Sequence, residues 1–422
     1  MNPINPVSSY YSSYKFPTLP TIMCKDYTEV LSKAKASKTS GIFVNSTKQT
    51  LTDKALTIDM TFITDLVIIC VLNIDMNGKS SLVLKGSNYS LSNISLLNGS
   101  TSFTAPSYVV DVSAVNLTII NFSMVNFKVK DSDKDYIRVA TSAKSFKMYN
   151  SLLDGKSNIG VFLRFDFPDH VYIKNSVFKN FTKISSDNGG EMIRLATSDY
   201  ETKDAFATID SCYFTNCVGD PEIVSVKCSS NTIKGCVFEK NSSSKLVFRH
   251  AHRCTSQHNY FDGSGMRIYG TDHKILDNQL NNSANILLDN KSGGSYVPAK
   301  NCVVDYLYYL DGTPVTNNSS TNKVTNVIKQ LKYPKSTFFN ATPVDPVDPV
   351  DPVDPVDPVD PVDPVDPVDP VDPVDPVDPV DPVDPVEILI PDIVDVNRIY
   401  RLNTNLTDVQ VQKILDQFML KK

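Results

Sequence analysis

Short apolar runs recur along the middle of the chain, and each run is closed by a leucine or an aromatic residue. The closing residues, at intervals of 25, 36, 24, 23 and 19, are Leu153, Phe178, Phe214, Phe238, Phe261 and Leu280. Each interval also holds short alternating strands, such as 171–173, 207–209 and 274–276, broken by Asn, Gly, Ser and Asp. A period near two dozen residues with three strands and polar corners indicates a right-handed parallel β-helix.

The longest interval, of 36 residues, predicts an insertion of roughly a dozen residues in one coil, at the polar stretch 197–204. A leucine-rich horseshoe would need a denser leucine framework, and a β-sandwich would not keep the period for so long. We therefore expect an all-β chain whose residues 25–340 form a single-stranded parallel β-helix, preceded by an N-terminal arm over residues 1–24.

Residues 343–386 repeat Pro-Val-Asp without any aromatic residue, and they contain 14 aspartates. Such a tract cannot bury a core, so we interpret 341–386 as an extended, disordered linker that could reach roughly 140 Å at about 3.1 Å per residue. The tract also masks the charge of the folded part. The whole chain carries −6, the tail balances its own charges, and +8 therefore remains on residues 1–342. A basic body suits a polyanionic partner, and nothing in the chain indicates nucleic acid.

The tail, residues 387–422, ends in a predicted short amphipathic helix. Its capping box is 407–410, and its apolar positions are Ile414, Leu415, Phe418 and Met419. This helix could bind a partner or self-associate, or it could fray. We expect no signal peptide and no membrane span, so the sequence leaves the location open, with action outside a cell or on a viral particle if the chain is a lyase. The eight cysteines lack paired zinc-type spacing, and we expect buried free thiols, although a Cys212–Cys236 disulfide is conceivable.

Two carboxylates, a lysine and an arginine lie on successive predicted coils. Asp220 and Glu222 are two residues apart, so both side chains can reach one cation, and Asn188 could add an amide oxygen. Lys227 lies five residues after Glu222, so the strand must bend or bulge around residues 225–226 for it to reach the same side.

The coil spacing stacks Lys227 beneath Arg249, 22 residues later, and places Arg267 near the same column. Neighbouring strands are about 4.8 Å apart, so the three cations would line one groove. Like charges this close repel one another unless an anion is present, which points to an anionic ligand. Basic side chains that splay outward into solvent are the plainer alternative.

These segments resemble the family 6 polysaccharide lyases, the group of chondroitinase B and several alginate lyases. The resemblance covers about residues 25–310, and it rests on 188–194, 222–227, Arg249-His250 and 270–273. It implies a β-helix with a groove for a uronic-acid polymer. Two positions depart from the family pattern: Asp220-Pro221-Glu222 replaces paired glutamates, and Ala251 replaces a glycine.

The resemblance also implies residue roles. Lys227 would be the catalytic base and Arg249 its catalytic partner. Ca²⁺ would be held by Asn188, Asp220 and Glu222. The substrate-binding residues would be Arg194, His250, Arg267 and His273.

We therefore expect a lyase that cleaves an alginate-like or dermatan- or chondroitin-like polymer by β-elimination. A non-catalytic glycan-binding β-helix, such as an adhesin or a viral attachment protein, would keep the basic groove without needing the base. A C5-epimerase of the same architecture would need a second proton donor on the opposite sugar face.

Overall fold

The computed structural model describes residues 17–338, apart from residues 52–54, 62–65, 77–80, 98–107, 128–134, 158, 183–188, 219 and 294–295. The predicted linker and C-terminal helix lie outside the described residues, as does most of the predicted N-terminal arm.

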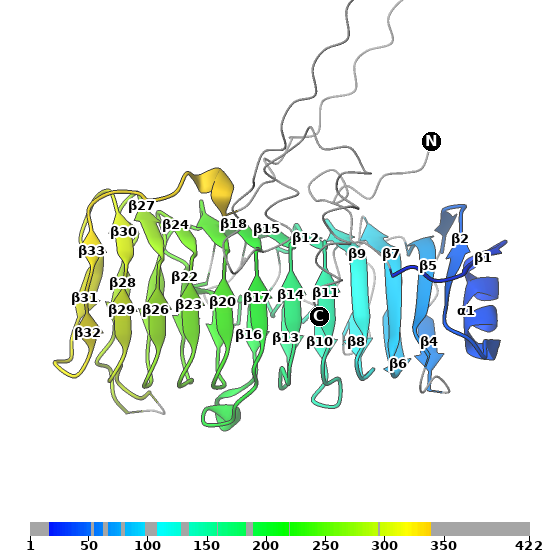
Figure 1. The fold of residues 1–422 in the computed structure, drawn as a ribbon, viewed down its shortest axis with the longest axis horizontal. Helices are drawn as coiled ribbons and strands as arrows, with labels where there is room; N and C mark the ends of the chain where they lie inside the picture. Colours follow the sequence, from blue (N-terminus) through cyan, green and yellow to red (C-terminus); the bar gives the residue numbers. More distant parts are fainter. Residues whose placement is uncertain are drawn as a thin grey trace, which may run out of the picture. The chain divides into compact units, whose positions relative to one another are not determined.

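The described chain winds into successive coils whose strands pair in parallel, which confirms the predicted β-helix (Figure 1). One sheet has eleven strands within the described residues, and these are β4 (Leu56–Met60), β6 (Leu82–Gly86), β8 (Val110–Val112), β10 (Ile137–Val139), β13 (Leu163–Phe165), β16 (Ile193–Leu195), β19 (Glu222–Val226), β22 (Lys245–Phe248), β25 (Met266–Ile268), β28 (Ile286–Leu288) and β31 (Val315–Asn317).

The second sheet contains two columns of strands that merge in the first coils. The first coils contribute β1 (Thr21–Cys24), β2 (Gly41–Asn45), β3 (Gln49–Thr50), β5 (Ile68–Asp75), β7 (Tyr89–Leu97) and β9 (Thr118–Val125). One column continues through β11 (Lys147–Tyr149), β14 (Tyr172–Lys174), β17 (Thr208–Asp210), β20 (Thr232–Lys234), β23 (Thr255–Gln257), β26 (Lys274–Leu276), β29 (Val303–Asp305) and β32 (Lys323–Val324). The other continues through β12 (Leu152–Asp154), β15 (Val177–Thr182), β18 (Tyr213–Val218), β21 (Val237–Glu239), β24 (Tyr260–Asp262), β27 (Gln279–Asn281), β30 (Leu307–Tyr309) and β33 (Val327–Ile328).

A residue in the left-handed region of φ makes the corner between these two columns in each coil. Small and polar side chains tolerate this conformation best, which explains the frequent Asn at the corner. From one coil to the next the corner residues, with φ between 50° and 63°, are Asn121, Asn150, Asn175, Ser211, Gly235, His258, Asp277 and Tyr306.

The interior of the helix keeps the predicted register. Phe178, Phe214, Phe238 and Phe261 pair in successive strands, and their rings stack with centroids 4.9, 4.7 and 4.9 Å apart. The predicted insertion is confirmed as well, because a short 3₁₀ helix, η2 (Ser198–Tyr200), lies between β16 and β17. All eight cysteines are described, and all are buried free thiols, as expected.

The N-terminal end of the core is closed by α1 (Tyr27–Ala36), which buries Val30 and Ala34. Asp26 caps this helix by accepting a hydrogen bond from the Glu29 N–H at 2.8 Å, and Glu29 accepts one from the Lys25 N–H at 2.6 Å. Strand β1 already pairs with β2, so the β-helix begins at Thr21 and not at residue 25 as predicted. No helix in the described ranges is long and apolar enough to cross a membrane.

Residues 330–338, here called the return segment, run back from the last coil across the outer side of β27 and β24 (Figure 1). Gln279 of β27 accepts hydrogen bonds from the N–H groups of Lys332 and Tyr333 at 2.9 and 3.0 Å. The segment ends in η3 (Lys335–Thr337), after which the ring of Phe338 packs on His258 and Tyr260.

Candidate active site

Lys227 and Arg249 occupy equivalent positions in two neighbouring coils. Val226 pairs with Phe248, so the residues that follow β19 and β22 are stacked at the same corner. The 22-residue offset predicted from the sequence is therefore present in the structure.

A buried carboxylate lies beside Lys227. The Lys227 Nζ is 3.3 Å from Oε1 of Glu191, whose side chain is 2% exposed. Glu191 immediately precedes the β16 region, one coil earlier, and its other oxygen, Oε2, is buried without a hydrogen-bond partner in the described structure. The sequence predicted a stack of cations that only a bound anion would relieve. In the structure Glu191 already provides Lys227 with a counter-charge, so that expectation is wrong for Lys227.

Arg249 has a carboxylate partner of its own. Its Nη1 donates to Oε1 of Glu222 at 2.8 Å. Burial opposes the charge on Arg249, but Glu222 and the nearby Tyr296 outweigh it, so the pKa of Arg249 is raised. Burial raises the pKa of Glu222, and Arg249 only partly offsets that rise. Arg249 Nε and Glu222 Oε2 are both buried without a hydrogen-bond partner among the described residues.

The Asp220 carboxylate accepts hydrogen bonds from backbone N–H groups. Its Oδ2 accepts a hydrogen bond from the Gly190 N–H at 3.0 Å, and its Oδ1 accepts one from the Glu222 N–H at 3.1 Å. Both oxygens of this carboxylate therefore hold the loops that carry Glu191 and Glu222 in place.

The predicted metal ligands do not form a complete set in the described part of the chain. Asn188 lies outside the described residues, and no group of three or more His, Cys, Asp or Glu side chains there is arranged to hold a metal ion. The buried Oε2 of Glu222 and the buried Oε2 of Glu191, both without a partner, are nevertheless the type of donor that a hard cation prefers.

The bulge that brings these groups together lies earlier than predicted. The pairing of β19 with β22 is regular from Val224 to Val226, and it shifts register between Glu222 and Val224. Ile223 and Val224 are both buried, so the additional residue is taken up by the core at the start of the strand. Lys227 reaches the outer side because it follows the end of β19.

Arg194 and Arg267 flank the stacked pair at a different level. Each lies in the middle of its strand, opposite Ser225 and Val247 respectively, two residues before the level of Lys227 and Arg249. Arg267 pairs with Asp289 at 2.8 Å, and an Arg194 nitrogen lies 3.7 Å from Asp135. Arg267 is therefore in a neighbouring column, with its own counter-charge.

The two histidines of the predicted site are both buried. His250 follows Arg249 and is 5% exposed, with its ring 5.2 Å from the ring of Tyr296. His273 has no exposed surface, and its two ring nitrogens contact the Cys254 N–H and the Tyr269 carbonyl at 3.0 and 2.8 Å. Burial lowers the pKa of His273 to about 4. The expectation that His273 binds substrate is therefore corrected: it is a neutral interior residue.

Two residues of the site, Glu191 and Tyr296, were not expected from the sequence. Glu191 lies inside the motif 188–194, but its proximity to Lys227 spans 36 residues and could not be seen from spacing. Tyr296 comes from the loop after β28, and its ring is 5.6 Å from the Arg249 guanidinium and 4.3 Å from Lys291 Nζ. No repeat or motif marked Tyr296.

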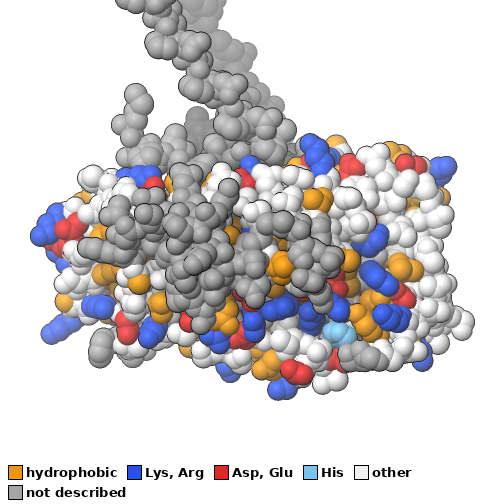
Figure 2. All heavy atoms as spheres, turned by 180° about the vertical axis from the view of Figure 1, so that it is seen from behind, with side chains coloured by type: hydrophobic (Ala, Val, Ile, Leu, Met, Phe, Trp, Pro, Cys, Tyr) orange, Lys and Arg blue, Asp and Glu red, His pale blue; other side chains and the backbone are white. Residues whose placement is uncertain are grey.

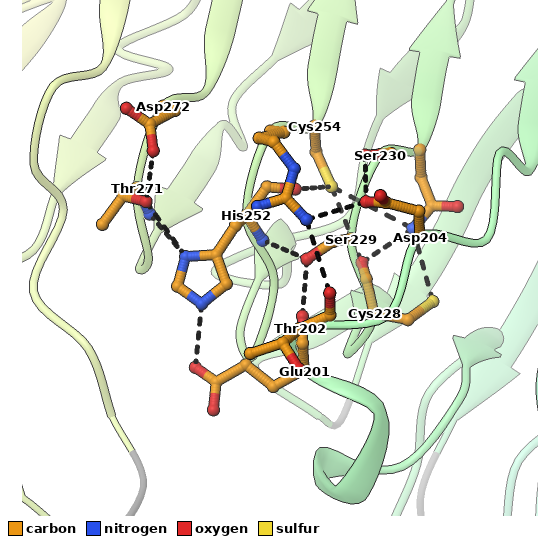
Figure 3. Close-up of polar contacts among 12 residues, drawn as sticks. Glu201, Thr202, Asp204, Cys228, Ser229, Ser230, His252, Cys254, Thr271 and Asp272 are labelled. Atoms are coloured by element: carbon orange, nitrogen blue, oxygen red, sulfur yellow. Dashed lines mark hydrogen bonds and ion pairs between the residues drawn. The ribbon is translucent and has the colours of Figure 1, made fainter.

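A polar network fixes the corner that follows Lys227 and Arg249 (Figure 3). Ser229 donates its hydroxyl to the Glu201 carbonyl at 2.5 Å and accepts from the His252 N–H at 2.9 Å. The His252 ring in turn accepts from the Thr271 N–H at 3.1 Å and faces the Glu201 carboxylate at 3.6 Å. Figure 2 shows a face on which Lys and Arg side chains lie among Asp and Glu side chains, in keeping with charges that are paired.

Residues 72–325, more than half of the chain, match the family model described as Chondroitinase B. No curated protein matches the chain.

Solved structures with a similar fold are alginate lyases and related lyases of family 6. AlyGC, an alginate lyase of this family, is 19% identical with a TM-score of 0.60, and the match covers 73% of this chain and 51% of AlyGC. A mannuronic acid specific family 6 lyase from human gut microbiota is 15% identical with a TM-score of 0.55, covering 74% of this chain and 82% of that one. This chain therefore spans about half the length of AlyGC, and identities this low show the shared fold. Together with the family match, they establish that the chain belongs to the chondroitinase B family, polysaccharide lyase family 6.

Proposed function

We propose that this chain cleaves a uronic-acid-containing polysaccharide, of the alginate or the dermatan and chondroitin type, by β-elimination. The observation that carries the proposal is the stacked pair Lys227 and Arg249, each beside a carboxylate, with Arg249 Nε and two carboxylate oxygens buried without partners in the described structure. Unpaired buried polar atoms cost about 1–3 kcal/mol each, and a bound anionic sugar or cation would supply their partners.

The proposed reaction needs a base and a counter-charge. The proton on C5 of a uronate is a weak acid because the new negative charge adds to that of the carboxylate. Arg249 binds this carboxylate and offsets the charge, while Lys227 is the base that accepts the C5 proton. The released electron pair forms a C4–C5 double bond. The bond from C4 to the glycosidic oxygen breaks, and this oxygen leaves with the bonding electrons and takes up a proton from water to become a hydroxyl group.

Ca²⁺ belongs to the proposal as an aid to substrate binding. Asn188, Asp220 and Glu222 would hold it, and the ion would add positive charge near the uronate carboxylate. The unpartnered Oε2 of Glu222 supports this assignment, whereas both oxygens of Asp220 already accept hydrogen bonds from backbone N–H groups.

The test compares variants on a panel of uronans, with and without Ca²⁺. Release of unsaturated product is followed by the ultraviolet absorbance of its conjugated double bond. Lys227→Ala should lose this activity and keep polymer binding nearly intact, because the base alone is removed. Arg249→Ala should weaken both binding and turnover, because Arg249 contacts the carboxylate in the ground state and in the transition state.

Lys234→Ala is the matched control, since Lys234 is 46% exposed on the other sheet, and it should behave as the wild type. Full activity in Lys227→Ala would overturn the assignment of the base. A wild type that bound a uronan tightly but released no unsaturated product would instead be a glycan-binding protein or, if the uronate composition changed, an epimerase.

A further inference from the structure

Lys156 is a fully buried lysine that the proposed reaction does not use. Its side chain has no exposed surface, although a lysine in a protein interior is rare because burying its charge is costly. The ammonium donates to the carbonyls of Ile159 and Gly160 at 2.8 and 2.7 Å. It also lies 4.7 and 5.1 Å from the ring centroids of Tyr136 and Phe181. These contacts fasten Ile159 and Gly160 onto a core position between two aromatic rings.

The backbone at Gly160, which Lys156 holds, supports the segment that carries Glu191. The Gly160 N–H donates to the Gly189 carbonyl at 2.7 Å, and the Phe162 N–H donates to the Glu191 carbonyl at 3.1 Å. The next amide along, Gly190 N–H, is the donor to Asp220. Gly160 and Gly189 both have positive φ, at 95° and 107°. Glycine is conformationally permissive, so the hydrogen bond between these two residues depends on surrounding contacts to keep both backbones in this conformation.

We propose that Lys156 is a positioning residue of the active site, whose ammonium fixes Gly160 and thereby places Gly189, Gly190 and Glu191 against Asp220 and Lys227. Only one part of this inference rests on the proposed function, namely the expected effect of Lys156 on the turnover of a uronan. Its structural part, that Lys156 orders residues 189–191, does not depend on which substrate is cleaved.

The surroundings of Lys156 make its charge sensitive to pH. Burial lowers the pKa of Lys156 to about 7, and Asp135, the nearby carboxylate, opposes this. Asp135 is itself shared with Arg164 at 3.0 Å and with Arg194 at 3.7 Å, and it accepts the Val161 N–H at 2.7 Å. Among the described residues, Tyr136 also faces the ammonium, and burial raises its pKa. A neutral amine makes weaker hydrogen bonds than an ammonium, so the grip on Gly160 loosens as pH rises.

Loss of the proton has opposite effects on the site and on the whole fold. Between about pH 7 and the ordinary lysine value of about 10.4, the unfolded chain keeps the proton and the folded chain releases it. Global stability linked to Lys156 therefore rises with pH over this window, while the local order of 189–191 falls. A lysine that only stabilised the fold would not change global stability and the local order of 189–191 in opposite directions.

The decisive experiment is hydrogen exchange with mass spectrometry on the full chain, in peptides that contain the Gly160 and Gly190 amides, together with steady-state kinetics. Lys156→Met has a similar volume and cannot donate. It should exchange faster at both amides, keep its melting temperature, and show a kcat about tenfold or more below wild type with a smaller change in KM. Lys156→Gln, which keeps an N–H donor, should recover part of both losses. Lys274→Met, at an exposed lysine of β26, should change neither.

Unchanged exchange at Gly160 and Gly190 in Lys156→Met would overturn the proposal, whatever the activity. Faster exchange in a protein whose wild type cleaves no uronan would sustain the positioning role and reject the proposed function. If the Met variant does not fold, the wild type decides: after correction for the intrinsic exchange rate, protection of these amides should fall between about pH 6.5 and 8.5 while the unfolding midpoint in urea rises. Constant protection over that range would also overturn it.

Discussion

Lys227 and Arg249, the two basic residues at the centre of the site, are each paired with a largely buried carboxylate. The Glu222 side chain is 12% exposed and the Glu191 side chain is 2% exposed. In the proposed reaction a uronate would bind Arg249 beside Glu222 at its Nε edge, which is free among the described residues, so that two carboxylates would share one guanidinium. Such an arrangement would favour a divalent cation bound alongside the sugar, because the cation would offset the second negative charge.

His273 makes the stability of the protein sensitive to acid. Its pKa is about 4 in the folded state and about 6.5 when unfolded, so the unfolded chain takes up a proton first as pH falls. The stability linked to this residue is present above about pH 6.5, and it is lost between there and about pH 4. The expected loss is about 3 kcal/mol, from about 1.36 kcal/mol per pH unit.

Urea unfolding of wild type and His273→Gln at several pH values measures this effect. The glutamine variant should be less stable at pH 7, because it removes a buried ring that lies tilted against Phe248, but its stability should fall less steeply towards pH 4. Parallel curves for the two proteins would show that His273 does not carry the acid sensitivity.

The positions of residues could be foreseen only where the coil repeat determined them. Lys227 and Arg249 were placed correctly because equal intervals give equal positions. His273 was misplaced because Gly270 and Asp272, with φ of 88° and 62°, turn the chain just before it and break the alternation of inner and outer side chains. Glu191 meets Lys227 across the coil that holds the insertion, where the interval is irregular.

At the level of elements, the interval between apolar runs fixed the register because a phenylalanine column tolerates no slip. A shift by one residue would turn the column outward and expose rings that now stack about 4.8 Å apart. The bulge in β19 was displaced from its expected place because sequence spacing requires an irregularity without saying which residue the core will accept. The return segment had no periodic signal and was not foreseen.

The return segment should contribute measurably to stability through Phe338, which is 4% exposed against His258 and Tyr260. Phe338→Ala should cost about 2–4 kcal/mol in urea unfolding, since a buried ring is removed from a site that cannot fully collapse. Leu310→Ala, at a 45% exposed side chain near the same end, should cost about 0.5 kcal/mol or less. Equal effects of the two changes would mean that the segment does not pack as described.

At the scale of the whole molecule, we expect the Pro-Val-Asp tract to be independent of the β-helix. Deleting residues 343–386 should leave the melting temperature within about 2 °C, because the repeat offers no aromatic residue and no mixed charge for packing. A truncation that ends at residue 329 also removes the return segment and should lower the melting temperature clearly. A large effect of the first deletion would show that the tract packs on the folded part.

The path of the return segment also sets the place at which the described chain ends. A solenoid normally releases its C-terminus from the last coil, but here Phe338 lies against Tyr260 of β24, in the coil that begins with β22 and leads through Arg249. The described chain therefore ends beside the coil that carries Arg249 and not at the last coil. If the Pro-Val-Asp tract is the extended spacer that the sequence predicts, a partner bound beyond it would stay within the reach of the spacer from this coil, and spacer length would set the local concentration of the two.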